Sequence, residues 1–295
     1  MSSKRIAVLF HREDRHYDPS RYMVDHLARY WRADGHEVVY LFGTRRFVPA
    51  DLVLVHVNLS VVPKSYLEFA ARYPIALNRH VRDIRKRAIS RHLVRPEGGW
   101  GGPVVVKSNL NYAGEPERRM RRTWLERRWP LAHRARRRID RARGDAPVFW
   151  ESGDYAVFDS LDAVPAAWLV HPEVVVEKFR PEVEEGLYHC RVFQFLGDRS
   201  TCTRLASPHP IVKMDRTVGA EAIEPDSGIL EWRERLRMDY GKLDYGVVDG
   251  EVVLFDANKT TGAAIPQGDS THMSRQRLES QRRHRAEGLY AYFGG

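Results

Sequence analysis

The sequence predicts two fold types in succession: an α/β region with a parallel sheet over the first eighty residues, and an α+β region with antiparallel strand pairs after it. In the first region, short apolar segments alternate with amphipathic helical segments, which is the pattern of parallel strands covered by helices. In the second region, strands follow one another without long helices, and two pairs are joined by Gly-Asp or Asp-Gly turn signals. A chain of 295 residues, 43% of them hydrophobic, is long enough for a large core.

The first region is predicted to contain three strands and two helices. They are the strand Ile6–Phe10, a helix from Asp18 to Gly35, the strands Val38–Phe42 and Leu52–Val57, and the helix Ser65–Tyr73. Asp18 and Pro19 have the residue types of a helix N-cap and a first helical position, and Gly35 is a typical helix stop. The stretch after the first strand, HREDRH, lacks the glycine-rich fingerprint of dinucleotide-binding domains, so a nicotinamide cofactor is not expected there.

The second region begins with a basic segment, residues 81–94, which is predicted to be helical and is followed by a glycine cluster at Gly98–Gly102. Two arginine-rich helices, separated at Pro130, are expected after the strand that ends at Lys107, and residues 274–293 are predicted to form a last helix of mixed polarity. The other strands are predicted at Val148–Trp150, Ala156–Phe158, Val174–Phe179, Leu187–Leu196, Ser200–Leu205, Tyr245–Val248 and Glu251–Asn258. Their order without long connecting helices favours antiparallel pairing.

Positive charge is concentrated in one segment of the chain. The formal net charge is +9, and residues 115–145 alone contain twelve Arg against five acids, which leaves about +2 for the rest. Such a segment is either an anion-attracting surface for nucleic acid or an acidic substrate, or an ordinary solvated helical face. Both interpretations stay open. The solvated face is favoured, because no aromatic platform or nucleic-acid fold motif accompanies the segment.

The hairpin with the turn Gly197-Asp198 is predicted to place two arginines side by side. With a two-residue turn, Arg191 on the first strand faces Arg204 on the second. Like charges directly opposite each other destabilise a sheet unless something neutralises them. Either an anion binds at the two guanidinium groups, or both side chains reach out to solvent from an exposed face.

The last hairpin carries oxygen ligands at the end of an apolar strand. Strand alternation puts Asp256 and Asn258 on one face. Asp244 on the partner strand joins them only if the turn is a three-residue loop, residues 248–250, because a two-residue turn would aim Asp244 at the opposite face. Carboxylate and amide oxygens are the hard ligands that Mg²⁺ prefers. The hairpin thus predicts a magnesium site that needs an odd-length loop, and the alternative is a strand that runs into a polar turn.

Taken in order along the chain, these motifs resemble the ATP-grasp superfamily, which includes D-alanine–D-alanine ligase, glutathione synthetase and glutamate ligases. The resemblance extends from Ile6 to about Gly262. It implies a Rossmann-like α/β N-terminal domain over residues 1–80, followed by an α+β ATP-grasp domain of two subdomains with antiparallel sheets. The small subdomain, with the arginine-rich segment, would cover residues 81–179, and the C-terminal subdomain, with the metal site, residues 180–295. In the family the two subdomains clamp ATP between them.

The resemblance also implies which residues bind the nucleotide. Lys86 and Lys107 are similar to the two lysines that bind the phosphates in the family. The stretch VVVEKF is similar to the hinge strand that meets adenine, and the residues expected to contact the base there are Glu177, Lys178 and Phe179. Glu184 is the residue best placed to hold the ribose, with Glu182 as the second candidate.

The metal set and the catalytic residues follow from the same resemblance. The family's metal ligands correspond to Asp244, Asp256 and Asn258, where Asp256 replaces the more usual Glu. Arg191 is similar to the family's arginine on a neighbouring strand, and Arg191 and Arg204 are expected to supply fixed donors to the acyl phosphate and the tetrahedral intermediate. The implied cofactors are ATP and Mg²⁺, with Mn²⁺ as an alternative ion.

Two further features have both a functional and an ordinary interpretation. The glycine cluster Gly98–Gly102 and the stretch 108–114 form either a mobile flap over the phosphates or plain loops. Lys213 and Lys259 are additional candidates for binding a phosphate or a carboxylate.

The activity implied by the resemblance is that of an ADP-forming carboxylate–amine ligase, an enzyme that makes an amide bond through an acyl phosphate attacked by an amine. Its partners would be a small-molecule or peptide carboxylate and an amine. The first alternative is a kinase on the same scaffold, and the second is a nucleic-acid binding protein that uses the arginine-rich helices. Nothing in the sequence indicates the oligomeric state.

A membrane partner is not expected, because no apolar run approaches the ~18 residues of a membrane span. The N-terminal sequence has only a short apolar run, which is too short for a secretory signal. The two cysteines, Cys190 and Cys202, suit a reducing compartment. These features together predict a cytoplasmic protein.

Overall fold

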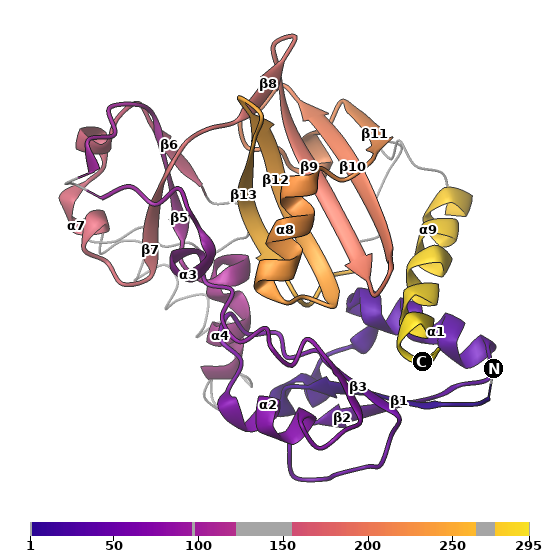
Figure 1. Cartoon of the computed structure of the whole chain (residues 1–295). Coiled ribbons are helices and arrows are strands. Elements are labelled where there is room, and N and C mark those ends of the chain that lie inside the picture. The colour runs from indigo at the N-terminus through magenta and orange to yellow at the C-terminus, as the bar shows by residue number, and fades with distance from the viewer. Residues whose placement is uncertain (1, 96–97, 122–154, 264–274, 295) are drawn as a thin grey trace. The chain divides into compact units, whose positions relative to one another are not determined.

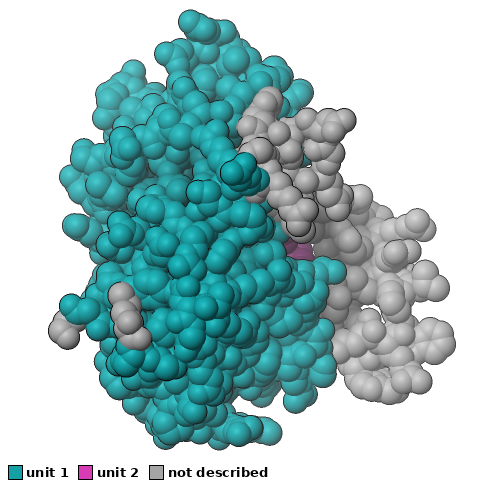
Figure 2. Space-filling view, turned by 90° about the vertical axis from the view of Figure 1, so that its right-hand side faces the viewer, with its two compact units in different colours: residues 1–82, 181–295 teal, residues 83–180 magenta. Residues whose placement is uncertain are grey.

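The computed structural model describes residues 2–95, 98–121, 155–263 and 275–294. The chain divides into two compact units: Met1–Arg82 together with Pro181–Gly295 form the first, and Asp83–Arg180 form the second (Figure 2). The predicted strand Val148–Trp150 and most of the arginine-rich segment lie outside the described residues. Within the described ranges, no helix combines the length and the apolar character that a membrane crossing requires.

The first unit contains a four-stranded parallel sheet in the order β2-β1-β3-β4 (Figure 1). Its elements are β1 (Arg5–Phe10), η1 (Arg12–His16), η2 (Pro19–Arg21), α1 (Met23–Ala33), β2 (Glu37–Phe42), β3 (Leu52–Val55), α2 (Lys64–Ala70) and β4 (Ile75–Leu77). The central strand β1 is buried on both faces, because Val8 packs in the cluster that includes α1 and Leu9 packs in the cluster that includes α2. The predicted parallel α/β region is confirmed, whereas its closer likeness to a Rossmann-like domain stays a prediction.

The first helix begins later than the sequence predicts. Asp18 does act as an N-cap, but it caps the single 3₁₀ turn η2, where its carboxylate accepts a hydrogen bond from the Ser20 backbone N–H at 2.9 Å. Tyr22 is extended, and α1 starts at Met23 because the Met23 N–H donates to the carbonyl oxygen of Thr261 at 2.9 Å. A contact with a residue far along the chain therefore moves the helix start. Gly35 ends the helix with a left-handed backbone, as predicted.

The first unit also contains a six-stranded antiparallel sheet in the order β11-β10-β9-β12-β13, with β8 paired to β9. Its elements are β8 (Glu182–Glu184), β9 (Leu187–Leu196), β10 (Arg199–Ser207), η6 (Met214–Arg216), β11 (Gly219–Ile223), α8 (Ser227–Leu236), β12 (Tyr240–Val248), β13 (Glu251–Asn258), α9 (Arg275–Glu287) and η7 (Gly288–Tyr292). Helix α8 packs on β12 and β13, and α9 contacts β9, β10 and α1 (Figure 1). The predicted antiparallel character is confirmed.

The second unit contains a three-stranded sheet in the order β6-β5-β7, antiparallel throughout. Its elements are α3 (Lys86–Ile89), β5 (Val104–Ser108), η4 (Asn111–Gly114), α4 (Glu115–Arg121), β6 (Ala156–Phe158), η5 (Leu161–Ala163), α7 (Ala166–Leu169) and β7 (Val174–Lys178). The central strand β5 is buried along its whole length, and its valines pack with those of β7. This core holds Lys107 at the end of β5.

The prediction of a helix over residues 81–94 is wrong except for the single turn of α3. Asp83 accepts hydrogen bonds from both the backbone and the side chain of Arg85, which holds the chain in a turn. Further on, Leu93 forms a bridge to Glu177, and the Val94 N–H donates to the Val176 carbonyl oxygen at 2.8 Å. Pairing with β7 therefore outweighs the helical propensity of this basic segment.

Candidate functional site

The hairpin β12–β13 places the three predicted metal ligands on one face, but by a different route from the one predicted. Its turn is a two-residue turn at Asp249-Gly250, both with positive φ, so the expected three-residue loop is wrong. Near the turn the register is regular, with Tyr245 opposite Leu254, and it then shifts so that Asp244 pairs with Asp256. This shift is a β-bulge.

The bulge decides on which side of the sheet the carboxylates meet. If the regular register from the turn continued, Asp244 would lie opposite Phe255, and its side chain would point away from Asp256. With Phe255 as the extra residue of the bulge, Asp244 lies opposite Asp256 and Lys242 lies opposite Asn258. Directly opposed residues of antiparallel strands share a face, so the bulge gathers these side chains on one side of the sheet.

The side chains of this cluster are joined by a hydrogen bond and an ion pair. The Asn258 Nδ2 atom donates to Asp256 Oδ2 at 3.2 Å, and the Lys242 ammonium lies 2.7 Å from Asp244 Oδ2. Burial lowers the pKa of Lys242, but the carboxylates of Asp244 and Asp256 outweigh this effect and raise it. The cluster thus already holds one positive charge.

The donor types fit a divalent cation. Two carboxylates and one carboxamide oxygen are hard ligands of the kind that Mg²⁺ takes. Within the described ranges, no group of three His, Cys, Asp or Glu side chains lies close enough to hold a metal ion. The third protein ligand would therefore have to be the amide oxygen of Asn258.

Lys242 is a member of this cluster that was not predicted from the sequence. The signal was present, because Lys242 lies two residues before Asp244 on the same strand and strand alternation puts both on one face. The strand was predicted to begin only at Tyr245, so this alternation was not applied to Lys242.

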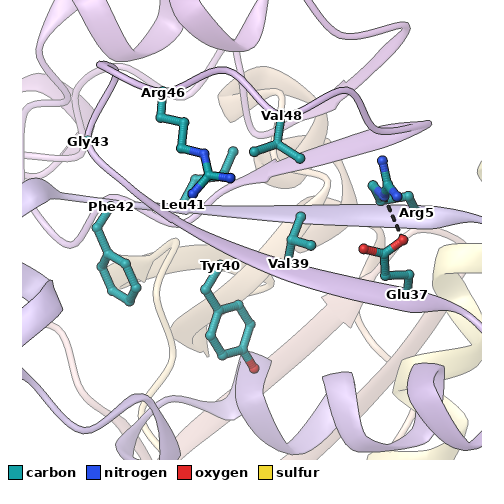
Figure 3. A pocket seen from close by; sticks show the side chains of 9 residues that line it. All are labelled: Arg5, Glu37, Val39, Tyr40, Leu41, Phe42, Gly43, Arg46 and Val48. Carbon is teal, nitrogen blue, oxygen red and sulfur yellow. Dashed lines mark hydrogen bonds and ion pairs between the residues drawn. The ribbon is translucent and has the colours of Figure 1, made fainter.

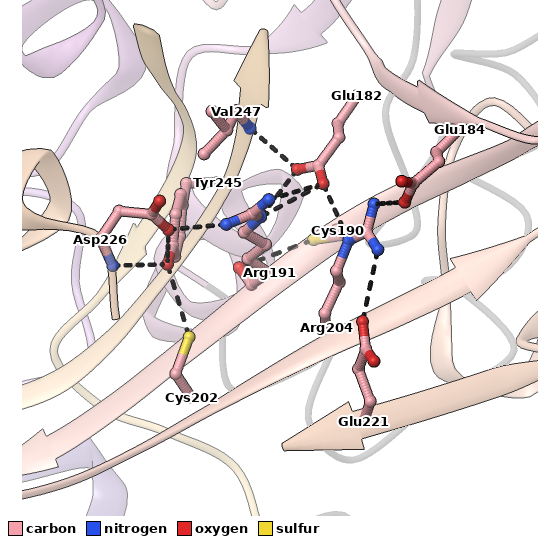
Figure 4. A network of polar contacts seen from close by, with 10 residues as sticks. All are labelled: Glu182, Glu184, Cys190, Arg191, Cys202, Arg204, Glu221, Asp226, Tyr245 and Val247. Atoms are coloured by element: carbon pink, nitrogen blue, oxygen red, sulfur yellow. Dashed lines mark hydrogen bonds and ion pairs between the residues drawn. The ribbon is translucent and has the colours of Figure 1, made fainter. Parts of the chain in front are cut away.

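The two facing arginines are neutralised by carboxylates of the chain (Figure 4). Arg191 faces Arg204 in the predicted register. The Arg191 Nε and Nη2 atoms donate to the two oxygens of Glu182, each at 2.9 Å, and Arg204 Nε donates to Glu182 Oε1 at 2.9 Å. Neither side chain reaches out to solvent, since both are less than one-fifth exposed. The anion that the register requires is thus Glu182.

Glu182 is held as a structural carboxylate within this network. The Val247 N–H also donates to it at 2.8 Å, and although burial raises the pKa of Glu182, the hydrogen bonds from Arg191 and Val247 lower it overall. Asp226 accepts from Arg191 Nη1 at 2.8 Å and from the Tyr245 hydroxyl at 2.8 Å. Glu184, the predicted ribose ligand, is bound by Arg204 and is exposed to solvent.

The register places these arginines on the opposite face of the sheet from the metal set. On β9, Val192 pairs with Asp244, whereas Arg191 pairs with Tyr245. Successive residues of a strand point to opposite faces, so Arg191 points away from Asp244. The expected role of Arg191 and Arg204 as fixed donors to the acyl phosphate and the tetrahedral intermediate stays a prediction.

In the second unit, Lys107 forms a buried ion pair with Glu177. The Lys107 ammonium lies 2.6 Å from Glu177 Oε2, and both side chains are less than one-tenth exposed. The register pairs Val105 with Glu177, so Lys107, two residues further on, shares a face with Glu177. A lysine and a glutamate that the sequence predicted from separate motifs are thereby brought together.

The predicted adenine hinge lies at the end of β7, and its backbone donors are engaged within the chain. The Lys178 N–H donates to the His92 carbonyl oxygen at 2.8 Å, and the Phe179 N–H donates to the Pro103 carbonyl oxygen at 2.9 Å. The Lys178 ammonium lies over the ring of Trp100 at 4.8 Å. A nucleotide contact at these two residues would therefore need groups other than these N–H donors.

Lys86, the other predicted phosphate ligand, lies in α3 beside the loop that follows β5. Its ammonium is buried and lies 3.5 Å from the Leu110 carbonyl oxygen, and its N–H donates to the Asn109 carbonyl oxygen. Asn109 and Asn111 are themselves buried. These contacts hold Asn109 and Leu110, the part of the predicted flap that follows Lys107 along the chain.

The two additional lysine candidates, Lys259 and Lys213, have different surroundings. Lys259 is buried, and its ammonium donates to the Leu59 carbonyl oxygen, while Thr260 donates to Asn58. These contacts tie the segment after β13 to the parallel sheet of the same unit. Lys213 is half-buried in the connection before η6.

A groove of about 600 Å³ runs along β2, the edge strand of the parallel sheet (Figure 3). Val39, Leu41 and Val48 form its apolar lining, and the Arg5–Glu37 ion pair and Arg46 lie along it. None of the nucleotide-binding, metal-binding or catalytic residues predicted from the sequence lines this groove.

The chain is similar in structure to ATP-grasp proteins, the class that the sequence motifs resemble. One is a RimK domain ATP-grasp protein from Sphaerobacter thermophilus, with 15% identity, 98% of both chains covered and a TM-score of 0.47. A second is D-alanine–D-alanine ligase from Bacillus anthracis complexed with ATP, with 13% identity, 99% of this chain and 96% of that chain covered and a TM-score of 0.43. A third is the ATP-grasp ligase PsnB complexed with a phosphomimetic variant of its minimal precursor, Mg and ADP, with 15% identity, 99% of both chains covered and a TM-score of 0.48. No family model matches the sequence, and no curated protein matches it.

Proposed function

We propose that the protein is an ATP-dependent, ADP-forming carboxylate–amine ligase that works through an acyl phosphate. The observation that carries this proposal is the bulged hairpin, which brings Asp244, Asp256 and Asn258 to one face together with Lys242. A bulge that re-aims side chains at the end of a strand is typical of functional sites. The buried Lys107–Glu177 pair, at the position of the two nucleotide motifs, supports the same proposal.

Phosphoryl transfer needs fixed positive charge near the phosphate oxygens. In the unit formed by Asp83–Arg180, Lys107 would supply that charge, and Glu177 holds its ammonium in place. In the other unit, Lys242 would supply it, since its ammonium is held by Asp244. Both lysines are oriented by a carboxylate before any substrate binds, which is the preorganisation that electrostatic catalysis requires.

Asp244, Asp256 and Asn258 are the residues that would hold Mg²⁺. The ion would supply charge neutralisation at the phosphates when it is bound. Asp256 is one methylene shorter than a glutamate, and its direct contact with Asn258 keeps the two oxygen ligands next to each other. The protein's own contribution is to fix these oxygens on one face of a rigid sheet.

The proposed reaction has two steps. A carboxylate oxygen of the first substrate attacks the γ-phosphorus of ATP, the bond from that phosphorus to the ADP oxygen breaks, and ADP leaves. An amine then attacks the carbonyl carbon of the acyl phosphate, the carbon–oxygen bond to phosphate breaks, and phosphate leaves as the amine loses a proton. The driving force of ATP hydrolysis is thereby coupled to amide formation.

A peptide or small-molecule carboxylate is the proposed first substrate. Among the structures to which the chain is similar, one is the macrocyclase MdnC bound with its precursor peptide MdnA (10% identity, 96% of this chain and 98% of that chain covered, TM-score 0.44). ATP and Mg²⁺ are the proposed cofactors.

Product analysis tests this proposal. The protein is incubated with Mg-ATP and pooled amino acids and peptides, and the nucleotide and phosphate products are quantified. ADP and free phosphate in equal amounts, with one ¹⁸O atom transferred from a labelled carboxylate to phosphate, are expected. AMP with pyrophosphate would contradict the proposal, and phosphate retained on the product would identify a kinase instead.

A further inference from the structure

Helix α9 carries two buried arginines one turn apart, Arg282 and Arg285. They are 5% and 3% exposed, although arginine is rarely buried without partners. The helix packs against α1 on one side and against β9 and β10 on the other, all within the first unit. The two guanidinium groups therefore lie in the interior, where each N–H needs an acceptor.

The hydrogen bonds of these side chains leave one edge of Arg282 without a partner. Its Nη1 atom donates to Glu279 Oε1 at 3.0 Å, but its Nε and Nη2 atoms have no acceptor in the described part of the chain. Arg285 donates from Nη1 to Gln194 at 2.6 Å and from Nη2 to Thr201 at 3.3 Å, and its Nε atom likewise has no acceptor among the described residues.

The Nε and Nη2 atoms form the edge of a guanidinium that binds an oxyanion with two parallel hydrogen bonds. This protein uses that edge elsewhere, because Arg191 binds both oxygens of Glu182 with its Nε and Nη2 atoms at 2.9 Å. Arg282 is more deeply buried than Arg191 and presents the same edge to no acceptor in the described ranges. Leaving a buried charged donor unsatisfied costs more free energy than leaving a neutral donor unsatisfied.

The local charge also favours an anion. Glu279 is the one acid in contact with either guanidinium within the described ranges, and it is half-exposed and shared with the Tyr30 hydroxyl. Burial, and to a smaller extent the charge of Arg282, lowers the pKa of His26 on α1. Burial lowers the pKa of Arg285 to about 10, with Arg282 adding to this effect, so Arg285 still carries its charge at pH 7.

We propose that Arg282 and Arg285 form a binding site for an oxyanion, a carboxylate or a phosphate group. The Nε–Nη2 edge of Arg282 would hold it, and the adjacent charge of Arg285 would stabilise it. Glu279, Gln194 and Thr201 fix the rest of the two guanidinium groups.

The proposed anion site is separate from the metal set, although it faces the same side of the sheet. Gln194, which binds Arg285, pairs with Lys242, and Lys242 pairs with Asn258 on the next strand. Two strand spacings, roughly 10 Å, thus separate Gln194 from Asn258. The inference does not depend on the proposed ligase activity, because it concerns anion binding alone.

Thermal unfolding in different salts tests the anion site. The midpoint is measured at pH 7 in sodium chloride, sodium acetate and sodium phosphate of equal ionic strength, for the wild type and for Arg282→Gln, Arg285→Gln and Arg283→Gln. Arg283 is the matched control, since it lies on the same helix but is exposed and paired with Asp34 and Glu287. Lys107→Gln is measured as well, to separate this site from the proposed nucleotide phosphates.

The wild type, Arg283→Gln and Lys107→Gln are expected to gain roughly 5 °C when the anion is at about a hundred times its dissociation constant. Arg282→Gln and Arg285→Gln are expected to lose that gain. In chloride, Arg282→Gln should be as stable as the wild type, because it removes unsatisfied donors. A response to acetate alone identifies a carboxylate ligand, and a response to phosphate alone identifies a phosphate ligand.

Two results would overturn the anion site. One is no response of the wild type to either anion beyond that to chloride. The other is an equal response in the wild type, Arg282→Gln and Arg285→Gln. If Arg282→Gln does not fold, Arg282→Lys takes its place, because it keeps the charge but lacks the two-donor edge and should respond more weakly than the wild type.

Discussion

Among single residues, Lys242 and Asp244 have the most direct consequence for the proposed activity. Their ion pair at 2.7 Å joins the proposed phosphate-directed charge and a proposed metal ligand on one strand. The Asp244 carboxylate both holds the Lys242 ammonium and is a proposed ligand of the metal ion, so its position affects both groups. Removing its charge while keeping its size should therefore affect the chemistry more than the fold.

Asp244→Asn is expected to lower the rate of ADP release at least ~100-fold, because it removes one ligand charge and the anchor of Lys242. The rate is measured with a coupled ADP assay at saturating Mg-ATP. Asp249→Asn is the matched control: it makes the same change in the turn of the same hairpin, where asparagine tolerates the positive φ. Equal loss in both variants would contradict the role given to Asp244.

His56 couples protonation to stability. It is fully buried among Phe10, Tyr22 and Tyr240, and neither ring nitrogen has a hydrogen-bond partner in the described part of the chain. Burial lowers its pKa from 6.5 to about 3. The unfolded chain therefore binds more protons than the folded chain between these values, and this part of the stability is complete above pH 6.5 and decreases as the pH falls below it.

The free energy of unfolding is expected to fall by about 1.2 kcal/mol between pH 6 and 5 from His56 alone. Urea unfolding of the wild type and of His56→Phe at several pH values measures this slope. The variant should show a slope that is smaller by that amount, since a phenyl ring fits the aromatic surroundings without titrating. Identical slopes would show that His56 does not titrate on unfolding.

At the scale of elements, local signals predicted the hairpins but not their irregularities. The turn signal Gly197-Asp198 and strand alternation were sufficient to predict that Arg191 faces Arg204. The bulge at Phe255 could not be predicted, because a register shift depends on packing across the whole hairpin. Two-residue and three-residue turns are equally compatible with the Asp-Gly signal, so the sequence left the position of Asp244 undecided.

The remaining errors have the same physical origin, contacts between residues far apart in the chain. The segment 81–94 has a helical pattern, but Val94 pairs with β7 instead. The carboxylate that neutralises Arg191 and Arg204 comes from β8, a strand of three residues that the sequence did not indicate. The family resemblance named both Lys107 and Glu177, but no sequence signal indicated that they form an ion pair.

The 3₁₀ helix η7 packs closely on the hairpin β9–β10. A Cβ atom at Gly288 would lie 1.9 Å from the Leu196 carbonyl oxygen, so one backbone must move. Gly288→Ala is therefore expected to lower the free energy of unfolding by roughly 2–4 kcal/mol. Gly101→Ala, with nothing within 4 Å of the new Cβ, is the control and should change stability little. Denaturant unfolding measures both, and equal values would contradict the close contact.

For the whole molecule, the important feature is that residues 1–82 and 181–295 form one unit. Asn78 links the two segments with four hydrogen bonds: its N–H binds Asp239 Oδ2, its amide donates to the Tyr240 carbonyl oxygen, and its side-chain oxygen accepts from the N–H groups of Asp239 and Tyr240. Asn78 is fully buried and has a φ of 57°, a conformation that asparagine tolerates.

Asn78→Ala should lower the free energy of unfolding by ~3 kcal/mol, because it leaves buried backbone groups unsatisfied and puts alanine in a strained conformation. Asn78→Gly removes the same hydrogen bonds without the strain, and it should lie between the wild type and Asn78→Ala. Calorimetry is the measurement. Wild-type stability in both variants would show that this link does not hold the two segments together.

The measurement that tests the proposed function most directly is the binding of a non-hydrolysable ATP analogue together with Mn²⁺. Calorimetry measures the affinity for the analogue, and electron paramagnetic resonance detects the bound ion. The wild type is expected to bind the analogue and the ion together, Lys107→Gln to bind the analogue at least ~10-fold more weakly, and Asp244→Asn to lose the signal of the bound ion. If the wild type binds neither, or if both variants bind as the wild type does, the assignment of an ATP-dependent ligase is wrong.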